Sequence, residues 1–173
     1  IEVQFAGDEE RLRFDLVNHE PSSGKGMTVS AVSVDGAPAT FTHRDHAVVV
    51  QLPRRFAKGE RLQLRIAYAG VPATGLRIAP NRHGERTFFS DNWPDKARHW
   101  LPTVDHVYDK ATSSMVVTAP AHYQVVSNGL LVEETDLPGG RRRTHWRQSV
   151  AISPWLYVLG VARFAVQHVD TYD

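Results

Sequence analysis

Cysteine is absent from the 173-residue chain. Its absence excludes disulfide bonds, thiolate zinc sites, iron–sulfur clusters and a cysteine nucleophile. The chain also lacks any apolar run of about 18 residues and opens without a basic-then-apolar leader, so we expect neither a transmembrane helix nor a signal peptide. Charge is balanced, with 20 Lys and Arg against 19 Asp and Glu and a net charge of +1. This balance predicts no nucleic acid and no membrane as partner.

Helical periodicity is equally scarce, whereas apolar and polar residues alternate with a period of two along much of the chain. This alternation is typical of half-buried strands. Hydrophobic residues make up 42% of the chain, enough for one real core. We therefore predict an all-β fold, an antiparallel β-sandwich of several sheets. The predicted strands cover residues 1–5, 12–16, 29–34, 47–52, 62–68, 76–78, 86–89, 114–118, 123–126, 130–134, 142–148, 155–159 and 162–168.

Turn signals separate most of these strands, among them Lys58-Gly59, Asn128-Gly129 and Pro138-Gly139-Gly140. The basic run 141–143 follows the last of these, and we interpret it as a solvated hairpin. One long irregular stretch remains between residues 90 and 109. Because long aperiodic loops in compact domains are usually functional, this stretch is the first place to look for a site.

Side chains that carry chemistry do not form a recognisable catalytic pattern. His43 and His46 lie close together, but we interpret them as a polar hairpin tip, and we expect His99 and His106 to make structural hydrogen bonds. The sequence contains no His-Glu-x-x-His run, no Gly-x-Ser-x-Gly elbow and no Gly-rich phosphate loop. We therefore predict no catalytic residue and no metal ligand in this chain.

A recognisable signature does occupy the irregular stretch. Residues 98–112 read Arg-His-Trp-Leu-Pro-Thr-Val-Asp-His-Val-Tyr-Asp-Lys-Ala-Thr. This run resembles the N-terminal domain of the M1 zinc aminopeptidases, which commonly read Arg-x-Trp-Phe-Pro-Cys-x-Asp-x-Pro-x-x-Lys-Ala-Thr there. Further matches follow in the family's order over nearly the whole chain, at residues 34–36, 52–53, 59–60, 66–70, 117–120, 127–129, 152–156 and 160.

The resemblance implies a saddle-like antiparallel β domain that precedes a thermolysin-like catalytic domain. In that family a His-Glu-x-x-His motif and a later Glu hold the zinc, and this chain contains neither part of that machinery. We therefore expect residues 1–173 to be a single M1-like N-terminal domain and a fragment of a longer chain. It would pack on the catalytic domain and wall its substrate cleft, without hydrolytic activity, with no cofactor of its own and with zinc in the parent.

The family's N-terminal domain lends one residue to the active site, a Gln or Glu that holds the free amino group of the peptide substrate. The resemblance places Trp93 at that position. Because an indole has one donor and no acceptor, it cannot replace a carboxylate that faces an ammonium group, although a cation–π contact is conceivable. Asp91 and Asp95 are the neighbouring carboxylates, and we take these three residues as the candidate substrate contacts.

The remaining signature residues are expected to serve the fold. We predict that Arg98 pairs with Asp105 and that Trp100 and Pro102 pack, with Lys110 as a further framework residue. The chain departs from the family at three positions, with Thr103 for Cys, His106 for an acidic residue and Val107 for Pro.

Two other functions stay open. One is a scaffold domain of an M1-like protein that has lost catalysis, because Trp93 replaces the amine-binding carboxylate. The other is a free-standing β-sandwich that binds carbohydrate or protein on an exposed platform of Trp93 and Trp100. Apart from its parent, the domain would expose apolar surface, so we also expect weak self-association.

Overall fold

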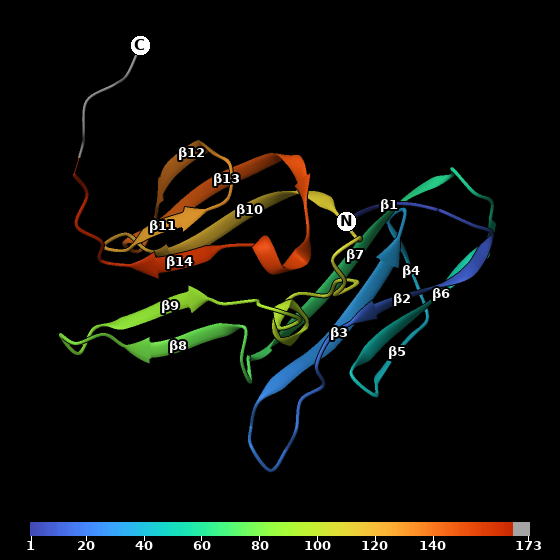
Figure 1. Ribbon diagram of the computed structural model, residues 1–173, viewed down its shortest axis with the longest axis horizontal. Helices are drawn as coiled ribbons and strands as arrows, with labels where there is room; N and C mark the ends of the chain where they lie inside the picture. The colour runs from blue at the N-terminus through green and yellow to red at the C-terminus, as the bar shows by residue number, and fades with distance from the viewer. Residues whose placement is uncertain (168–173) are drawn as a thin grey trace. The chain divides into compact units, whose positions relative to one another are not determined.

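The computed structural model describes residues 1–167, and these residues form an all-β fold (Figure 1). Fourteen strands assemble into four antiparallel sheets, and the only helices in the described part of the chain are two short 3-10 turns, η1 (Ala97–His99) and η2 (Pro154–Leu156). The predicted fold class is therefore confirmed. No helix within these residues is long and apolar enough to span a bilayer.

The chain divides into two compact units. Unit 1 comprises Ile1–Leu76, Asp91–Lys110 and Ser153–Leu156; unit 2 comprises Arg77–Ser90, Ala111–Ile152 and the chain from Tyr157 onward. Neither unit is continuous in sequence. The prediction of a single domain over residues 1–173 stays a prediction.

Unit 1 is a sandwich of two sheets. One sheet has the order β1 (Glu2–Gln4), β7 (Arg61–Val71), β3 (Gly26–Val34), β4 (Ala37–Pro38), and the other has the order β2 (Glu9–Asp15), β6 (Ala47–Phe56), β5 (Phe41–Arg44). Alternate side chains along β3, β6 and β7 are buried, as a pleated strand with one covered face requires. The core of this unit includes Leu16, Val32, Val34, Val48, Val50, Leu62 and Leu64.

Unit 2 also contains two sheets. The first has the order β10 (Ala111–Pro120), β13 (Arg141–Ile152), β12 (Leu130–Leu137), and the second has the order β11 (Gln124–Ser127), β14 (Leu159–Ala162), β9 (Arg86–Ser90), β8 (Leu76–Pro80). Trp146 of β13 ties the sheets together, because its Nε1 donates to the carbonyl of Val125 on β11 at 2.9 Å. Val125, Thr144, Leu159 and Val161 are buried here.

The predicted end of a strand at residue 52 is wrong, because β6 continues through Pro53 to Phe56. Proline lacks an N–H and is excluded from a regular central strand, but here it lies opposite a register shift between Glu9 and Arg11 of β2. Beyond Gln51 the neighbouring β5 no longer pairs with β6. No ladder hydrogen bond is therefore required from residue 53.

The two last predicted strands are also wrong in their bounds. Residues 155–159 do not form a strand: Pro154 opens η2, where the amide of Leu156 donates to the carbonyl of Ser153 at 3.0 Å. The final strand occupies residues 159–162 in place of 162–168, and the end of the predicted strand at His168 lies outside the described residues. Two short strands, β4 and β5, were not predicted.

Candidate functional site

The irregular stretch between β9 and β10 is anchored to unit 1 by Arg98 and Asp105. The backbone N–H and Nε of Arg98 donate to the same carboxylate oxygen of Asp105, at 3.0 and 3.2 Å. The Asp105 side chain is only 2% exposed. Its backbone N–H in turn donates to Asp15 at the end of β2, at 3.2 Å. The structure thus brings the two signature residues together and fixes the loop to a strand.

Trp100 is the buried centre of this loop, with 6% of its surface exposed. Its Nε1 donates to the side-chain oxygen of Asn92 at 2.8 Å, and its carbonyl accepts from the hydroxyl of Tyr68 on β7 at 2.9 Å. Burial raises the pKa of Tyr68 to about 12. The idea of an exposed platform that includes Trp100 is therefore wrong, because the hydrogen bond to Asn92 holds this ring inside.

The loop of residues 91–96 packs closely against the backbone of Gly75. The amide of Asp91 donates to the Gly75 carbonyl at 2.7 Å, and the amide of Lys96 donates to the carbonyl of Asn92 at 2.9 Å. Gly75 has a φ of +76°, and a Cβ there would lie 2.2 Å from the carbonyl oxygen of Lys96. Only glycine permits this close approach, so residue 75 sets the position of the loop that carries Trp93.

Trp93 lies on this loop with 60% of its surface exposed. One face of its indole stacks on Trp155 of η2, with ring centroids 4.2 Å apart and an angle of 22° between the planes. Two residues before Trp155, Ser153 donates its hydroxyl to the carbonyl of Val107 at 2.6 Å, which fixes the start of η2 to the irregular stretch. The Nε1 of Trp155 is buried and has no hydrogen-bond partner within residues 1–167. The stack therefore joins two segments far apart in sequence.

Asp91 and Asp95 flank Trp93 on the same exposed loop. Asp91 pairs with Lys96 at 3.3 Å, with 66% of its side chain exposed. No salt bridge holds Asp95 in the described part of the chain, and its charge acts on the nearby ring of His99. Of the other signature residues, Pro102 is half-buried and Lys110 is exposed just before β10.

The histidines within residues 1–167 make separate contacts. His46 accepts from the amide of Asn18 through Nδ1 at 3.2 Å, and the ring of His106 packs against that of Tyr108 at a tilt of 43°, with centroids 4.0 Å apart. Burial, with the adjacent charge of Arg98, lowers the pKa of His99, whose buried Nδ1 has no hydrogen-bond partner among the residues that the structure describes. Within residues 1–167 no group of three or more His, Cys, Asp or Glu side chains converges as metal ligands would.

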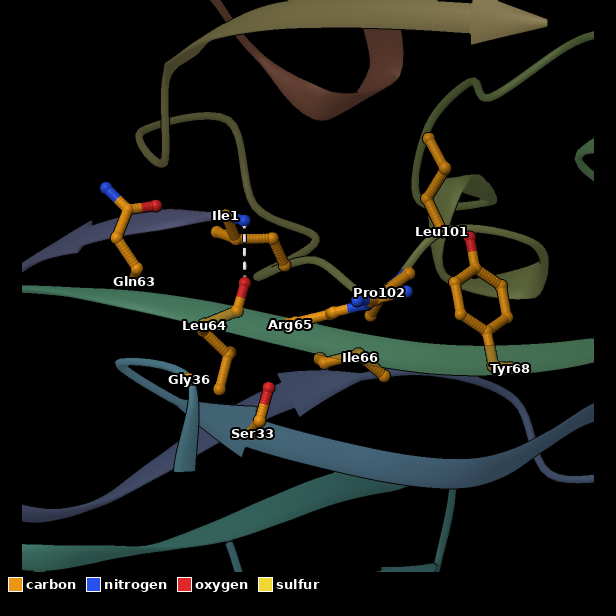
Figure 2. Close-up of a pocket in the computed structure, with 10 residues that line it drawn as sticks. All are labelled: Ile1, Ser33, Gly36, Gln63, Leu64, Arg65, Ile66, Tyr68, Leu101 and Pro102. Carbon is orange, nitrogen blue, oxygen red and sulfur yellow. Dashed lines mark hydrogen bonds between the residues drawn. The ribbon is translucent and has the colours of Figure 1, made fainter. Parts of the chain in front are cut away.

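A hollow of about 660 Å³ lies in unit 1 between the exposed side of β7 and residues 101–102. Figure 2 shows Tyr68 beside Leu101 at one end and the N–H of Ile1 directed at the Leu64 carbonyl near the other. Sequence reasoning did not predict it, since the strand pattern of residues 62–68 does not show which face stays uncovered. It holds no acid–base pair. The lining residues are Ile1, Ser33, Gly36, Gln63, Leu64, Arg65, Ile66, Tyr68, Leu101 and Pro102.

The signature loop and its supports lie inside a longer family match, because the model of the Peptidase M1 N-terminal domain matches residues 2–156. The chain belongs to this family. The resemblance stated from the sequence is therefore confirmed, and the matched range contains Trp93, Trp155 and both partners of the Arg98–Asp105 pair.

Solved M1 peptidases share this structure. An M1 zinc metallopeptidase from Deinococcus radiodurans is 27% identical, with a TM-score of 0.79 over 92% of this chain and 36% of that one. A variant of the enzyme from that organism bound to a Tyr-Ser-Ala substrate, and a two-domain M1 zinc metallopeptidase variant bound to L-tryptophan, are each 30% identical with the same TM-score and coverage. The chain thus spans about a third of these structures. No curated protein matches it.

Three residues that hold the irregular stretch between β9 and β10 in place were not predicted from the sequence, namely Gly75, Asn92 and Trp155. Each acts through a contact with a residue at least 8 positions away. Periodicity reports which face of a strand is buried, and it carries no information on loop partners of this kind. The one available signal for Trp155 was the Ser-Pro pair before it, which disfavours a strand at that point.

Proposed function

We propose that the chain is the non-catalytic N-terminal domain of an M1-like zinc metallo-aminopeptidase. It packs on the catalytic domain of the same parent chain and forms one wall of the substrate cleft. The observation that carries this proposal is the family match over residues 2–156, together with solved peptidases of which the chain covers 36%. The rest of such a protein would supply the chemistry.

The zinc belongs to the proposed catalytic domain. The donor set of this chain does not fit the metal, because the described residues bring no three ligating side chains together. Structural and catalytic zinc sites both require at least three protein ligands in a converging geometry. No step of the reaction is therefore assigned to the residues of this domain, and its contribution is to position the peptide.

Asp91, Trp93 and Asp95 are the proposed contacts with the N-terminus of the peptide substrate. Trp93 is exposed five residues before the signature residue Arg98, and an exposed indole can attract the substrate's ammonium group. The carboxylates on either side supply the negative charge that an indole lacks. A solved relative binds a Tyr-Ser-Ala substrate, which supports peptides with a free amino end as the substrate class.

The isolated chain tests the first part of the proposal. We expect no hydrolysis of aminoacyl-naphthylamides, with or without added zinc. Turnover that a chelator removes would overturn the proposal that this domain is non-catalytic. The coding sequence downstream of Asp173 tests the second part, because an intact His-Glu-x-x-His followed by a Glu is expected there.

A scaffold domain of an M1-like protein without catalysis is the second candidate. The observation that favours it is Trp93 in place of the family's Gln or Glu, since an indole cannot accept a hydrogen bond from the substrate's amine. A degenerate zinc motif downstream of Asp173 would support the scaffold function. In either case the isolated domain exposes Val107, Tyr108 and Leu156, and weak self-association in sedimentation experiments is expected.

A further inference from the structure

The basic run at residues 141–143 is divided between the two faces of a sheet in unit 2. β13 is the central strand of the sheet β10-β13-β12, and its side chains alternate between the two faces (Figure 1). Arg142 lies on the same face as the buried Thr144 and pairs with Asp136 at 2.7 Å. The opposite face, here called the basic face, carries the side chains of Arg141, Arg143, His145 and Arg147.

The basic face has an excess of positive charge. The strand register adds Ser114, Val116, Thr118 and Pro120 of β10 and Leu130, Glu133, Thr135 and Leu137 of β12 to this face. Glu133 is the one carboxylate among them, and it accepts from Arg143 at 2.6 Å and from the hydroxyl of Thr135. No salt bridge among residues 1–167 includes Arg141 or Arg147. Two guanidinium groups thus stay uncompensated.

The spacing of these side chains matches that of an extended peptide. A strand rises about 3.3 Å per residue, so the basic side chains of β13 repeat about every 6.7 Å, and Arg141 lies about 20 Å from Arg147. An extended segment of a partner has the same repeat, because every second side chain points to one face. Carboxylates at every second position of such a segment would therefore meet successive basic side chains of β13.

A protein segment fits this face better than a nucleic acid does. Proteins that bind single-stranded nucleic acids stack the bases on aromatic side chains, and no Phe, Tyr or Trp lies on the basic face. Val116 and Leu130 of this face are 54% and 77% exposed, which offers contact area to aliphatic side chains. The net charge of +1 for the whole chain is also small for attraction of a phosphate backbone.

We infer that the basic face is a docking surface for a partner protein, which binds through an extended acidic segment with carboxylates at every second position. Arginine suits this role because its planar guanidinium donates two parallel hydrogen bonds to one carboxylate. Exposed ion pairs contribute little singly, so binding depends on several of them in register. The inference is independent of the proposed function, since no residue of the irregular stretch between β9 and β10 takes part.

The test measures binding of two acidic peptides to the complete chain encoded by the gene, by fluorescence anisotropy. The first probe is an eight-residue peptide, acetylated and labelled with fluorescein, in which glutamate and threonine alternate. Acetylation removes the free amino end that an aminopeptidase site would bind. The second probe has the same composition with its glutamates together, so that an extended chain presents only half of them on one face. We expect the alternating peptide to bind about fivefold tighter, because two more ion pairs form.

A pair of double variants places the binding on this face. Arg141→Gln with Arg147→Gln removes both uncompensated cations and is expected to weaken binding of the alternating peptide about fivefold. Arg142→Gln with Arg163→Gln is the matched control, since it removes the same charge from arginines that already pair with carboxylates elsewhere. The control should change the Kd by less than about twofold. Thermal melts establish that each variant is folded.

A charge added to the face is a second test. Thr118→Glu places a carboxylate opposite Arg143 on the neighbouring strand, where it competes with the peptide, and should also weaken binding. Equal affinities for the two peptides would overturn the requirement for alternating carboxylates. An equal loss in the control double variant would reduce the effect to net charge and overturn the docking surface. A thymidylate oligonucleotide of equal charge that binds tighter than the alternating peptide would overturn the choice of a protein partner.

Discussion

At the scale of single residues, Arg98 depends on one buried carboxylate. Replacing Asp105 with alanine removes two hydrogen bonds and leaves a half-buried guanidinium without its closest partner. Hydrogen bonds to charged groups contribute about 2 kcal/mol. We therefore expect Asp105→Ala to lower the free energy of unfolding by about 2 kcal/mol, as measured by urea denaturation.

The matched control is Asp136→Ala. Asp136 pairs with Arg142 at 2.7 Å, a shorter distance than the Arg98–Asp105 contact, but 71% of its side chain is exposed. Exposed ion pairs contribute little because water screens them. The Asp136→Ala control should unfold at nearly the same urea concentration as the unmodified domain. Equal midpoints for both variants would contradict the structural role assigned to Asp105.

Tyr68 provides a second prediction at this scale. Its hydroxyl donates to the Trp100 carbonyl, and burial raises its pKa to about 12, above the ordinary value of about 10. A raised pKa stabilises the fold fully below pH 10, and this contribution is lost as the pH rises through 12. We expect Tyr68→Phe to cost about 1 kcal/mol at pH 7.

The same variant has a pH signature. The parent's stability should fall between pH 10 and 12, and Tyr68→Phe should remove that part of the decline. Ultraviolet difference spectra of tyrosinate formation measure the pKa directly. If all tyrosines of the unmodified domain titrated near pH 10, the burial of the Tyr68 hydroxyl would be contradicted.

At the scale of elements, two glycines with the same backbone conformation have different surroundings. Gly75 and Gly84 have φ values of +76° and +80°, but a Cβ at residue 75 would lie 2.2 Å from the Lys96 carbonyl oxygen, and at residue 84 it would meet nothing within 4 Å. Gly84→Ala therefore carries only the cost of a left-handed conformation, about 1 kcal/mol.

We expect Gly75→Ala to destabilise the fold more than Gly84→Ala, because the Trp93 loop must also move away from the new methyl group. Chemical denaturation compares the two free energies of unfolding, and the circular dichroism of the stacked indoles reports displacement of Trp93. If the two variants were equally stable and both kept the stacking signal, residue 75 would not set the position of this loop.

An ion pair and a backbone hydrogen bond, both to Glu60, stabilise the turn between β6 and β7. Arg54 donates to both carboxylate oxygens of Glu60, at 2.7 and 3.1 Å, and the Ala57 amide donates to one of them at 2.6 Å. These bonds lower the pKa of Glu60 to about 2, and the bond from the Arg54 side chain has the largest effect. Because the folded pKa is depressed, the stabilisation is present above the ordinary value of about 4.3 and is lost as the pH falls toward 2.

We expect nuclear magnetic resonance titration to give a pKa of about 2 for Glu60, and Arg54→Gln to return it toward the ordinary value. Glu60→Gln should remove the loss of stability below pH 4 that belongs to this turn. Glu10→Gln on the exposed side of β2 is the control, with no such effect expected. A Glu60 that titrates near pH 4 in the parent would show that the turn is open in solution.

Most strands could be predicted from the sequence because their pattern is local. The alternation in β7 and the Lys58-Gly59 turn before it follow directly from side-chain spacing. The course of β6 past Pro53 depends on a register shift in the neighbouring strand, and the 3-10 turn at Trp155 depends on a hydrogen bond across it. Neither the register shift nor this hydrogen bond can be predicted from the local sequence pattern.

The candidate site was partly predictable for the same reason. Trp93 and its flanking carboxylates lie at fixed offsets from the signature, so the resemblance was enough to name them as candidates, which they remain. Their arrangement was not, since the partner of Trp93 comes from residue 155 and the support of Trp100 from Asn92. Such contacts are decided by packing between distant segments.

At the scale of the whole molecule, we propose that this domain positions the peptide and that a catalytic domain outside residues 1–173 carries out the chemistry. The chain matches an M1 N-terminal domain over residues 2–156 and corresponds to 36% of the solved peptidases that it resembles. Its described residues include a fixed aromatic surface but no converging metal ligands. The domain and the zinc site should therefore act only together.

The most direct test of this central claim is hydrolysis of aminoacyl-naphthylamides by the complete chain, measured before and after a zinc chelator and again after zinc is restored. We expect turnover by the complete chain that the chelator abolishes and zinc restores, and none by residues 1–173 alone. Turnover that is insensitive to the chelator, or a complete chain inactive on every aminoacyl substrate, would contradict it.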